Sequence, residues 1–150
     1  INETTRDFTY IYSLNVLEHV ERDGMVIDEL YSALSPGGRL FVYVPALEVL
    51  FSAMDKKVGH YRRYRKEKLK QLLESAGFRV EKAAYTDFLG VFATLAYKFW
   101  PQKPHGSVKS SQVSFYDRFI FPFSRVLSTP FSKILGKNVY AVAEKPYTSS

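Results

Sequence analysis

Two short segments stand one helix apart in this chain, Asn15-Val16-Leu17-Glu18-His19-Val20 and Leu34-Ser35-Pro36-Gly37-Gly38-Arg39-Leu40. An apolar run over residues 8–12 precedes the first segment, and residues 40–44 continue the second. Both runs are rich in aromatic and β-branched residues, as is typical of strands covered on both faces in a parallel sheet. A helical apolar stripe begins at Asp23 between them. The order strand, helix, strand predicts a βαβ unit with a right-handed crossover.

The rest of the chain continues this alternation. Ser35-Pro36-Gly37-Gly38 is predicted to end the first helix by turn chemistry, and Gly77 to end the second. The further elements expected are a loop over 46–64, a helix over 65–76, a strand over 79–84, an apolar helix over 88–100, a loop over 102–114, an aromatic and partly helical segment over 115–134, and a strand over 138–143. The alternation indicates the α/β class.

Composition is consistent with one folded domain of 150 residues, since 46% of the residues are hydrophobic and 16% aromatic. There is no cysteine, which excludes disulfides and thiolate metal sites and is compatible with the cytosol. The longest apolar run, over 88–97, is shorter than the roughly 20 residues that a membrane-spanning helix needs. The chain begins at Ile1 without a leader of the signal-peptide kind, and we interpret it as a fragment or a processed product.

The net charge is +6, and eight basic residues gather between 56 and 70. Such a cluster attracts phosphates, nucleic acid or anionic lipid. A solvated helix face is the alternative, because Leu69, Leu72 and Leu73 interleave with the charges at helical spacing. We expect no nucleic-acid partner.

The two opening segments, in this order of elements, resemble the second half of a class I S-adenosylmethionine-dependent methyltransferase. The resemblance implies part of an α/β, Rossmann-like fold. This part would contain the family's strands four, five, seven and six, in that order in the sheet, with flanking helices. Residues 1–150 would form the C-terminal part of a single domain, with an aromatic helical insertion over 88–135 before the last, antiparallel strand. The chain is most similar to the small-molecule branch that includes the ubiquinone-biosynthesis O-methyltransferases. Gly59-His60-Tyr61-Arg62-Arg63-Tyr64 also resembles methyltransferases of bacterial polysaccharide and lipid-linked sugar loci.

The chain departs from the family in one large respect. The acidic, glycine-rich turn that approaches the cofactor in the family is not in this sequence, and no Gly-x-Gly-x-Gly run occurs. The cofactor-binding N-terminal half is therefore absent, and the strand over 8–12, from Phe8 to Tyr12, would be an unpaired apolar edge. We expect the missing half, or a second copy of the chain, to cover that edge.

Several candidate site residues follow from the resemblance. S-adenosyl-L-methionine would be the cofactor, with half of its site made by Ser13, Leu14, Asn15 and His19. Asn15 offers hydrogen bonds at the end of the strand, or it caps the following turn. His19 is a candidate general base, or a residue that packs at a helix start and orients its neighbours. We expect Glu18 to bind backbone amides at a helix N-terminus.

The connection after the second strand reaches the same rim of the sheet, because parallel strands share a carboxyl end. We expect substrate contacts there from His60, Tyr61, Arg62 and Tyr64, with His60 as a second candidate base. Arginine suits an anionic substrate, and tyrosine can stack on a ring. The alternative is a surface ion-pair network with ordinary aromatic packing. Asp55 and His60 alone do not make a metal site, so no metal is predicted.

The leading hypothesis is part of a methyltransferase that acts on a small-molecule or lipid-linked acceptor. The alternative is a non-catalytic fragment that binds a partner chain or a membrane surface. Half of a nicotinamide-dependent Rossmann enzyme is a third interpretation, which the antiparallel last strand argues against. The expected location is cytoplasmic. Peripheral membrane contact is expected as well, because aromatic and basic residues mix over 115–134. Extra core over the sheet, or a lid, would explain the same mixture.

Overall fold

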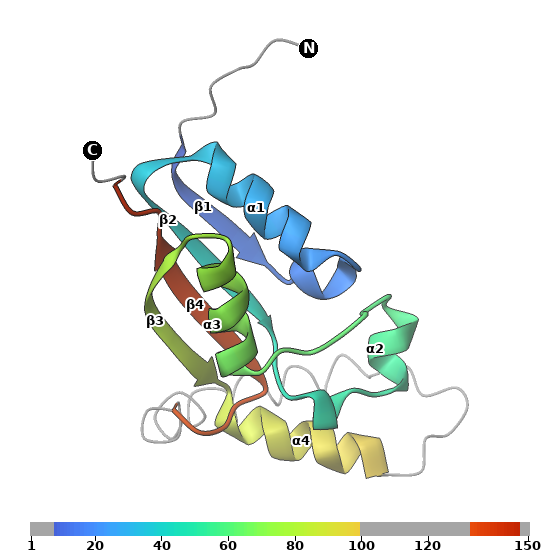
Figure 1. Ribbon diagram of the computed structural model, residues 1–150. Helices are drawn as coiled ribbons and strands as arrows, with labels where there is room; N and C mark the ends of the chain where they lie inside the picture. The colour runs from blue at the N-terminus through green and yellow to red at the C-terminus, as the bar shows by residue number, and fades with distance from the viewer. Residues whose placement is uncertain (1–7, 100–132, 148–150) are drawn as a thin grey trace.

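The computed structural model describes residues 8–99 and 133–147, which form one sheet with helices packed over it (Figure 1). Within these residues the sheet has four strands, β1 (Phe8–Leu14), β2 (Leu34–Pro45), β3 (Arg79–Thr86) and β4 (Asn138–Glu144), in the order β1-β2-β4-β3. Helices α1 (Asp23–Ala33) and α3 (Lys66–Ser75) lie over the same face of the sheet, and α4 (Phe88–Phe99) lies across its end (Figure 1).

The pairing of the strands matches the predicted topology. β1 and β2 run parallel, with Ser13 opposite Val42. β4 runs antiparallel to both of its neighbours, so that Ala141 lies opposite Val42 on one side and Ala83 on the other. The prediction of the strand order four, five, seven and six, with an antiparallel strand inserted last, is therefore confirmed.

The hydrophobic core lies between the sheet and the two helices. Alternate residues of the central strands point to this side, because side chains in a strand alternate between faces. On the strands the buried residues are Leu40, Val42, Val44, Val139, Ala141 and Ala143, and on the helices they are Ile27, Leu69 and Leu73. Each fully buried leucine or isoleucine contributes about 1.5–3 kcal/mol to stability. The core therefore holds the carboxyl ends of β1 and β2 in fixed positions.

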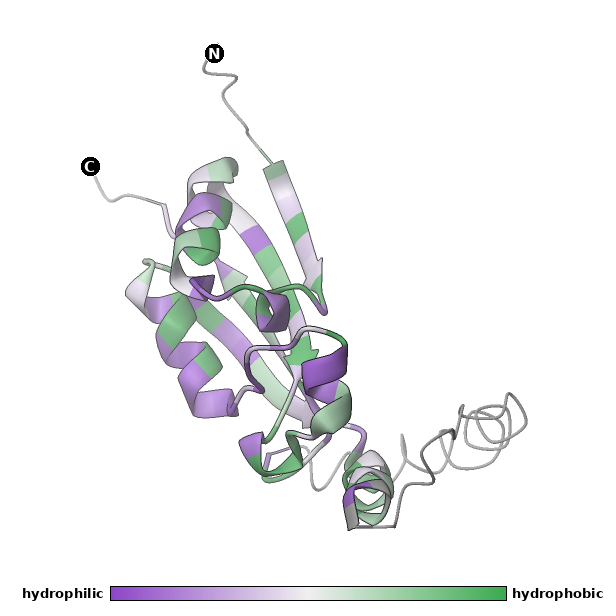
Figure 2. Cartoon of the chain, turned by 90° about the vertical axis from the view of Figure 1, so that its right-hand side faces the viewer, coloured by the Kyte–Doolittle hydropathy of each residue, from purple (hydrophilic) through white to green (hydrophobic). Residues whose placement is uncertain are grey.

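The opposite face of the sheet carries no helix in the part of the chain that the structure describes (Figure 2). Tyr10, Tyr12 and Leu14 on this face are 58%, 69% and 55% exposed. An aromatic row continues across the sheet, because the Tyr12 and Phe41 rings lie 6.3 Å apart and the Phe41 and Tyr140 rings 5.9 Å apart. The expectation that residues 8–12 are covered on both faces therefore does not hold within these residues.

The segment after α1 differs from the prediction. The helix ends at Ala33, and Leu34 is already extended with ψ 142°, so β2 includes the Pro-Gly-Gly stretch that we expected to be a turn. Gly37 has φ +78°, and a Cβ atom at Gly38 would lie 3.0 Å from the carbonyl oxygen of Phe8. The glycines thus let β2 pass close to β1, where the register shifts between Phe8 and Tyr10.

The connection from β2 to α3 is not a plain loop. It contains two short helical segments, η2 (Glu48–Leu50) and α2 (Ala53–Lys57). α2 begins with a capping box, in which Ser52 and Asp55 each accept a hydrogen bond from the other's backbone. The predicted loop over 102–114 and aromatic segment over 115–134 lie almost wholly outside the described residues. Among those residues no helix is long and apolar enough to cross a membrane.

Candidate functional site

The candidate site lies at the carboxyl ends of β1 and β2, where two connections meet. β1 ends at Leu14, and a turn at Asn15, with φ +51°, leads into the short helix η1 (Leu17–His19). The Asn15 backbone N–H donates to Tyr43 O at 2.8 Å, which holds this turn on β2. The second connection returns beside it, because the Tyr61 N–H donates to Glu18 O at 2.8 Å.

Three side chains with metal-binding or proton-transferring groups converge at this junction. The His19 and His60 rings lie edge to face with centroids 4.6 Å apart. One nitrogen from each ring and one carboxylate oxygen of Glu18 all lie within 4.8 Å of one another. Gly59 has φ +83°, and a Cβ atom there would lie 3.9 Å from His19 Nδ1. The glycine turn thus places His60 against His19.

Glu18 is the unusual member of this group. It is 1% exposed, and neither carboxylate oxygen has a hydrogen-bond partner among the described residues. Burial raises the pKa of Glu18, because the charged form loses its hydration. The backbone amide that acts on this carboxylate is that of Glu18 itself, which lowers the pKa less than burial raises it, and among the described residues no other backbone N–H donates to it. A buried carboxylate without a partner is costly, on the order of several kcal/mol when it is ionised, so its position needs an explanation.

Asp55 holds the His60 ring from the other side. Asp55 Oδ1 lies 2.9 Å from His60 Nδ1 and 2.8 Å from Arg63 Nε, and Asp55 Oδ2 accepts a hydrogen bond from the Ser52 hydroxyl at 2.8 Å. Burial by itself would raise the pKa of Asp55, but the hydrogen bonds from Arg63, Ser52 and His60 outweigh it and lower this pKa to about 2. Asp55 is therefore an ionised acceptor at neutral pH.

The state of Asp55 decides the tautomer of His60. A carboxylate can only accept a hydrogen bond, so His60 Nδ1 carries the hydrogen and Nε2 of the neutral ring keeps its lone pair. An imidazole in this state can take a proton from an acceptor group or bind a cation. Arg63 is 8% exposed at its side chain, and it keeps the charge of Asp55 balanced.

The residues predicted to bind the cofactor lie together at the end of β1. Ser13 is buried at 7% exposure, whereas Leu14 and Asn15 are exposed beside His19. Leu14 and Asn15 form an exposed surface, apolar and amide-bearing, at the carboxyl end of β1, and ligands of α/β sheets bind at the carboxyl ends of strands. Leu14 is 55% exposed and Val16 is 47% exposed, so this edge offers apolar contact area on one side. The residues present therefore fit one wall of a cofactor site.

The substrate-contact predictions divide into two groups. His60 and Tyr61 lie at the junction, and Tyr61 is 55% exposed. Tyr64 is 4% exposed, and its hydroxyl donates to Asp23 Oδ2 at 2.7 Å. A role for Tyr64 in stacking on a substrate does not fit this placement, because the ring belongs to the core. Burial, followed by the hydrogen bond to Asp23, raises the pKa of Tyr64.

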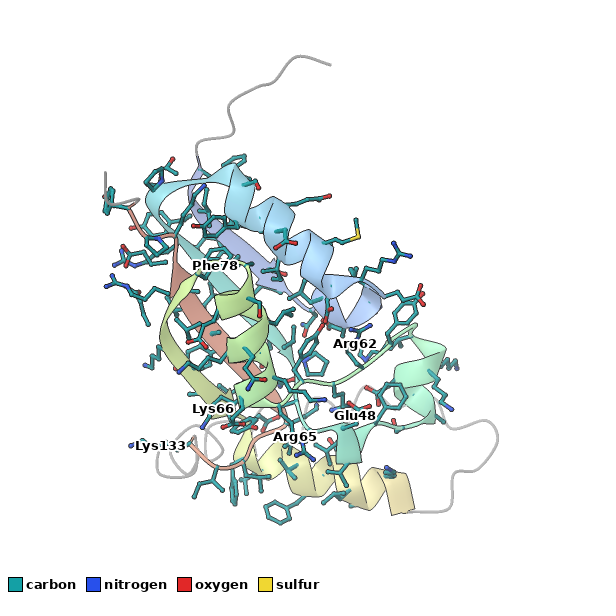
Figure 3. All side chains as sticks on the ribbon, in the orientation of Figure 1. Glu48, Arg62, Arg65, Lys66, Phe78 and Lys133 are labelled. Carbon is teal, nitrogen blue, oxygen red and sulfur yellow. The ribbon has the colours of Figure 1, made fainter. Side chains whose placement is uncertain are left out.

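Arg62 is held in the structure by other groups. It pairs with Asp23 at 3.1 Å and donates to Glu21 O at 2.5 Å, and it lies between the start of α1 and α2 (Figure 3). An anionic substrate would have to compete with these contacts. The alternative of an ion-pair network therefore describes Arg62 better than the substrate-contact prediction does.

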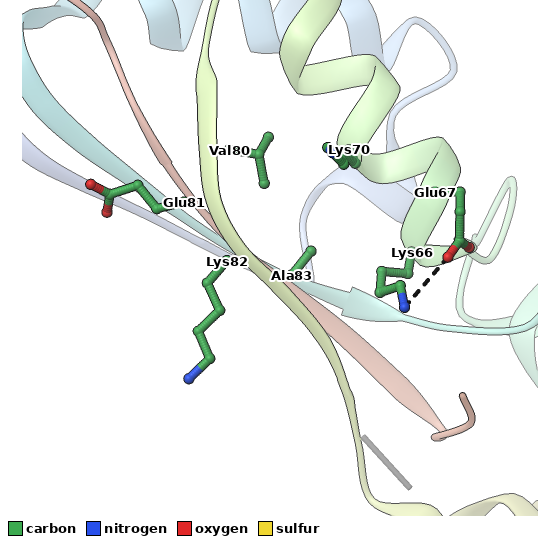
Figure 4. Close-up of a pocket in the computed structure, with 7 residues that line it drawn as sticks. All are labelled: Lys66, Glu67, Lys70, Val80, Glu81, Lys82 and Ala83. Atoms are coloured by element: carbon green, nitrogen blue, oxygen red, sulfur yellow. Dashed lines mark ion pairs between the residues drawn. The ribbon is translucent and has the colours of Figure 1, made fainter. Parts of the chain in front are cut away.

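A shallow pocket lies elsewhere, between α3 and β3 (Figure 4). The side chains of Val80 and Ala83 point toward α3 there, whereas Lys82 points away from the helix. β3 is at the opposite edge of the sheet from β1, so this pocket is separate from the histidines. Its lysines have protein partners, since Lys66 pairs with Glu67 at 3.4 Å and Lys70 with Glu74 at 3.5 Å. These contacts favour the solvated-face interpretation of the basic cluster.

The sequence predicts several residues of this site but not their assembly. Asp55 and His60 have no third ligand near them in the sequence, whereas the structure places Glu18 and His19 beside His60 and orients the His60 ring through Asp55. The Ser52-x-x-Asp55 spacing is a recognisable capping-box signal. Nothing local predicts that the turn at 59–61 lies against Glu18, because that contact joins two connections.

Comparisons with known proteins agree with this fold. A family model described as a methyltransferase domain matches residues 1–83. A protein of Mycolicibacterium smegmatis named a probable S-adenosylmethionine-dependent methyltransferase is 30% identical over 105 residues, which are 69% of this chain and 39% of that protein. The chain thus spans about two fifths of the length of this curated relative.

Two solved structures show the same architecture. A SAM-dependent methyltransferase from Archaeoglobus fulgidus matches with a TM-score of 0.54 and 19% identity, over 94% of this chain and 61% of that one. An S-adenosylmethionine-dependent methyltransferase from Mesorhizobium loti matches with a TM-score of 0.55 and 14% identity, over 96% of this chain and 64% of that one. The family match over more than half of the chain, on this fold, shows that the chain belongs to the family of methyltransferase domains.

Proposed function

We propose that the chain is the acceptor side of an S-adenosylmethionine-dependent methyltransferase that acts on a small-molecule or lipid-linked acceptor. The family membership supports the reaction class. One observation supports the site: Asp55 Oδ1 lies 2.9 Å from His60 Nδ1 and so orients the His60 ring. This ring lies beside His19 at the carboxyl ends of β1 and β2. The bound cofactor supplies an activated methyl group. One side of the cofactor would be held by Ser13, Leu14, Asn15 and His19.

The residues of this chain would position the acceptor and take its proton. Methyl transfer is a displacement, so catalysis rests mainly on orientation. His60 Nε2 carries the lone pair that can accept a proton from a hydroxyl or amine nucleophile, because Asp55 binds Nδ1. Tyr61 follows His60 directly in the sequence, and its exposed ring offers an aromatic surface to the acceptor. Ionised Asp55 stabilises the imidazolium that results.

The bare face of the sheet supports a further part of the proposal. Tyr10 and Tyr12 are more than half exposed on edge strand β1. The chain spans 61% and 64% of the two solved methyltransferases it matches, so their fold has elements that this chain does not cover. We propose that the complementary βα elements of the methyltransferase fold pack on this edge and face. A second copy of the chain is the competing occupant.

The direct experiment for the reaction uses the protein together with whatever coding sequence precedes Ile1 in its gene. Methyl-tritiated S-adenosylmethionine is incubated with small-molecule and polar-lipid extracts, and the label is followed into aqueous and chloroform phases. Label in either phase that disappears for His60→Gln and persists for Glu29→Gln, a control at an exposed residue of α1, supports the proposal. Transfer that is equal in the two variants would exclude His60 as the base, and no transfer in any fraction would reject the reaction.

The second candidate is a binding module without catalysis, which the exposed aromatic row Tyr12–Phe41–Tyr140 favours. The nucleotide sequence before the codon for Ile1 distinguishes the two. A strand followed by an acidic Gly-x-Gly turn there supports the enzyme, since that turn is the second wall of the cofactor site. A start codon at this point supports the module.

A further inference from the structure

The described residues contain one group of three side chains whose donor atoms are placed to share a cation. These are Glu18, His19 and His60, and their nearest donor atoms all lie within 4.8 Å of one another. Glu18 is 1% exposed with both oxygens unpartnered among the described residues. A buried polar group without a partner needs an explanation, such as an ion. Two imidazoles and a carboxylate face each other here without hydrogen bonds that would satisfy the carboxylate.

We propose that Glu18, His19 and His60 bind a divalent transition-metal ion of the zinc class. Two histidine nitrogens and one carboxylate oxygen are a donor set that Zn²⁺ accepts with a fourth position open. Harder ions such as Mg²⁺ prefer oxygen ligands and suit this set less well. A bound cation would also neutralise Glu18, which accounts for a carboxylate buried in this position.

The surroundings of the site are those of a ligand-orienting shell. Metal-binding histidines commonly donate their second ring N–H to a carboxylate, which fixes the ring and its tautomer. Asp55 does this for His60 at 2.9 Å, and Arg63 holds Asp55 at 2.8 Å. On the other side, the hydrogen bond from Tyr61 N–H to Glu18 O ties the turn that carries His60 to the turn that carries Glu18. The two connections are thus joined at the proposed site.

The distances require only a small adjustment. Two ligands of one metal ion, each bound at about 2.0–2.2 Å, lie about 3.3 Å apart in tetrahedral geometry. The donor atoms here lie within 4.8 Å of one another, so no pair has to close by more than about 1.5 Å. His19 is exposed and contacts only the edge of the His60 ring among the ring contacts described, whereas Glu18 is buried and His60 is held by Asp55. The open side of the site is therefore the side of His19, toward solvent.

This inference rests on the proposed function and deepens it. A metal ion lowers the pKa of a bound hydroxyl or water. With the ion present, the two histidines act as ligands, and the open position takes the oxygen nucleophile of the acceptor. The acceptor class is then a hydroxyl-bearing molecule, and its proton leaves to solvent as the oxygen binds the cation. Without an ion, His60 remains a candidate base.

The test measures metal binding, so it does not depend on methyl transfer. The protein is stripped with a chelator and titrated with Zn²⁺ by calorimetry, and with Co²⁺ by visible absorption. The chain has no cysteine and only three histidines, so the Co²⁺ spectrum reports few other sites. We expect one equivalent of Zn²⁺ per chain, a Co²⁺ spectrum typical of nitrogen and oxygen ligands, and weaker binding of Mg²⁺.

Four variants make the test specific. Glu18→Gln and His19→Gln are expected to abolish the Co²⁺ spectrum, and Asp55→Asn to weaken Zn²⁺ binding by about 10–100-fold through loss of ring orientation. Glu29→Gln, at an exposed residue of α1, is the matched control and is expected to bind as the parent protein does. His19 is exposed, so its variant should fold normally, which circular dichroism checks.

The outcomes are distinct. Binding that survives Glu18→Gln and His19→Gln, no one-to-one binding of Zn²⁺, or Mg²⁺ bound as tightly as Zn²⁺ would each overturn the metal site. Metal binding that these variants abolish supports the site even when no acceptor is methylated, and then only the proposed reaction fails. Methyl transfer without metal binding would reject this inference and leave the proposed reaction standing.

Discussion

Asp55 and His60 form a hydrogen-bonded pair, with Asp55 Oδ1 2.9 Å from His60 Nδ1, at the point where the connection after β2 turns back toward β1. The same carboxylate binds Arg63 and the Ser52 hydroxyl, so one buried acid caps α2, balances a buried arginine and fixes a histidine tautomer. Because these tasks share one side chain, changes at Asp55 should affect stability and the candidate site together.

Replacing Asp55 should be strongly destabilising. Asp55→Ala leaves Arg63, 8% exposed at its side chain, without its carboxylate, and breaking a buried pair in this way costs about 3–5 kcal/mol. Ser52→Ala removes only the cap and should cost about 1 kcal/mol. Urea unfolding of the two variants measures the difference. Equal losses would show that the Arg63 contact contributes little.

The pH dependence of stability should carry the signature of Asp55. Its pKa falls from 3.8 to about 2 on folding, so its contribution is complete above about pH 5 and is lost as the pH falls toward 2. A tenfold change in an acid dissociation constant corresponds to about 1.4 kcal/mol, so this contribution is about 2 kcal/mol. Urea unfolding of the protein at pH 6 and pH 3 should show about half of it, roughly 1 kcal/mol, because a carboxyl with a pKa of about 2 in the folded protein is still largely ionised at pH 3. Asp28→Asn, at an exposed site, should preserve the slope, whereas Asp55→Asn should flatten it.

The glycine at position 38 should be required for the pairing of β1 with β2. A Cβ atom there would lie 2.8 Å from Ser35 O and 3.0 Å from Phe8 O, which are both backbone atoms that cannot move aside. Gly38→Ala should therefore cost about 1–3 kcal/mol through overpacking. Gly24→Ala is the matched control, because the nearest atom to its Cβ would be 3.9 Å away. Thermal unfolding should show the control to be as stable as the parent or up to about 1 kcal/mol more stable, because alanine is favoured over glycine within a helix.

Tyr64 should act on stability and not on substrate affinity. Tyr64→Phe removes the one hydrogen that a buried hydroxyl donates to Asp23 Oδ2 at 2.7 Å, with Leu17 O as the more distant acceptor at 3.1 Å. The loss of this hydrogen bond should cost about 1–2 kcal/mol in the free energy of unfolding, because Asp23 keeps a polar oxygen without this donor. Tyr61→Phe, at an exposed ring, should change stability by less than about 0.5 kcal/mol. In an active preparation, a higher KM for Tyr64→Phe at unchanged stability would contradict the placement in the core.

The exposed face of the sheet should make the protein prone to association. Tyr12 is 69% exposed and continues the aromatic row to Phe41 on an edge strand, and edges of this kind invite pairing. Tyr12→Lys should therefore lower the apparent mass in light scattering without unfolding the chain, because a charge on an edge opposes pairing. Asp28→Lys, on exposed α1 surface, is the control for added charge. A parent protein that is monomeric at all concentrations would contradict this prediction.

Much of the fold was predictable because its elements are local. The aromatic and β-branched runs, the helical stripe from Asp23 and Gly77 with φ +96° at the end of α3 each depend on neighbouring residues alone. The strand order also followed, through the family resemblance. Local patterns failed where a long-range contact set the backbone conformation. Gly38 packs closely against Phe8 of β1, and the Pro-Gly-Gly stretch therefore belongs to β2 and not to a turn.

At the candidate site, what the sequence determines differs most clearly from what the tertiary structure determines. Residue types and strand ends were sufficient to place His19 and His60 on one rim of the sheet, because parallel strands share a carboxyl end. Only the tertiary structure brought Glu18 to them and buried its carboxylate, moved Tyr64 into the core and set Asp55 against His60. The physical reason is that burial and hydrogen-bond partners are properties of the packing. Tyr64 reaches Asp23 from 41 positions away, and Asp55 and His60, only five residues apart, meet because the connection after β2 folds back on itself.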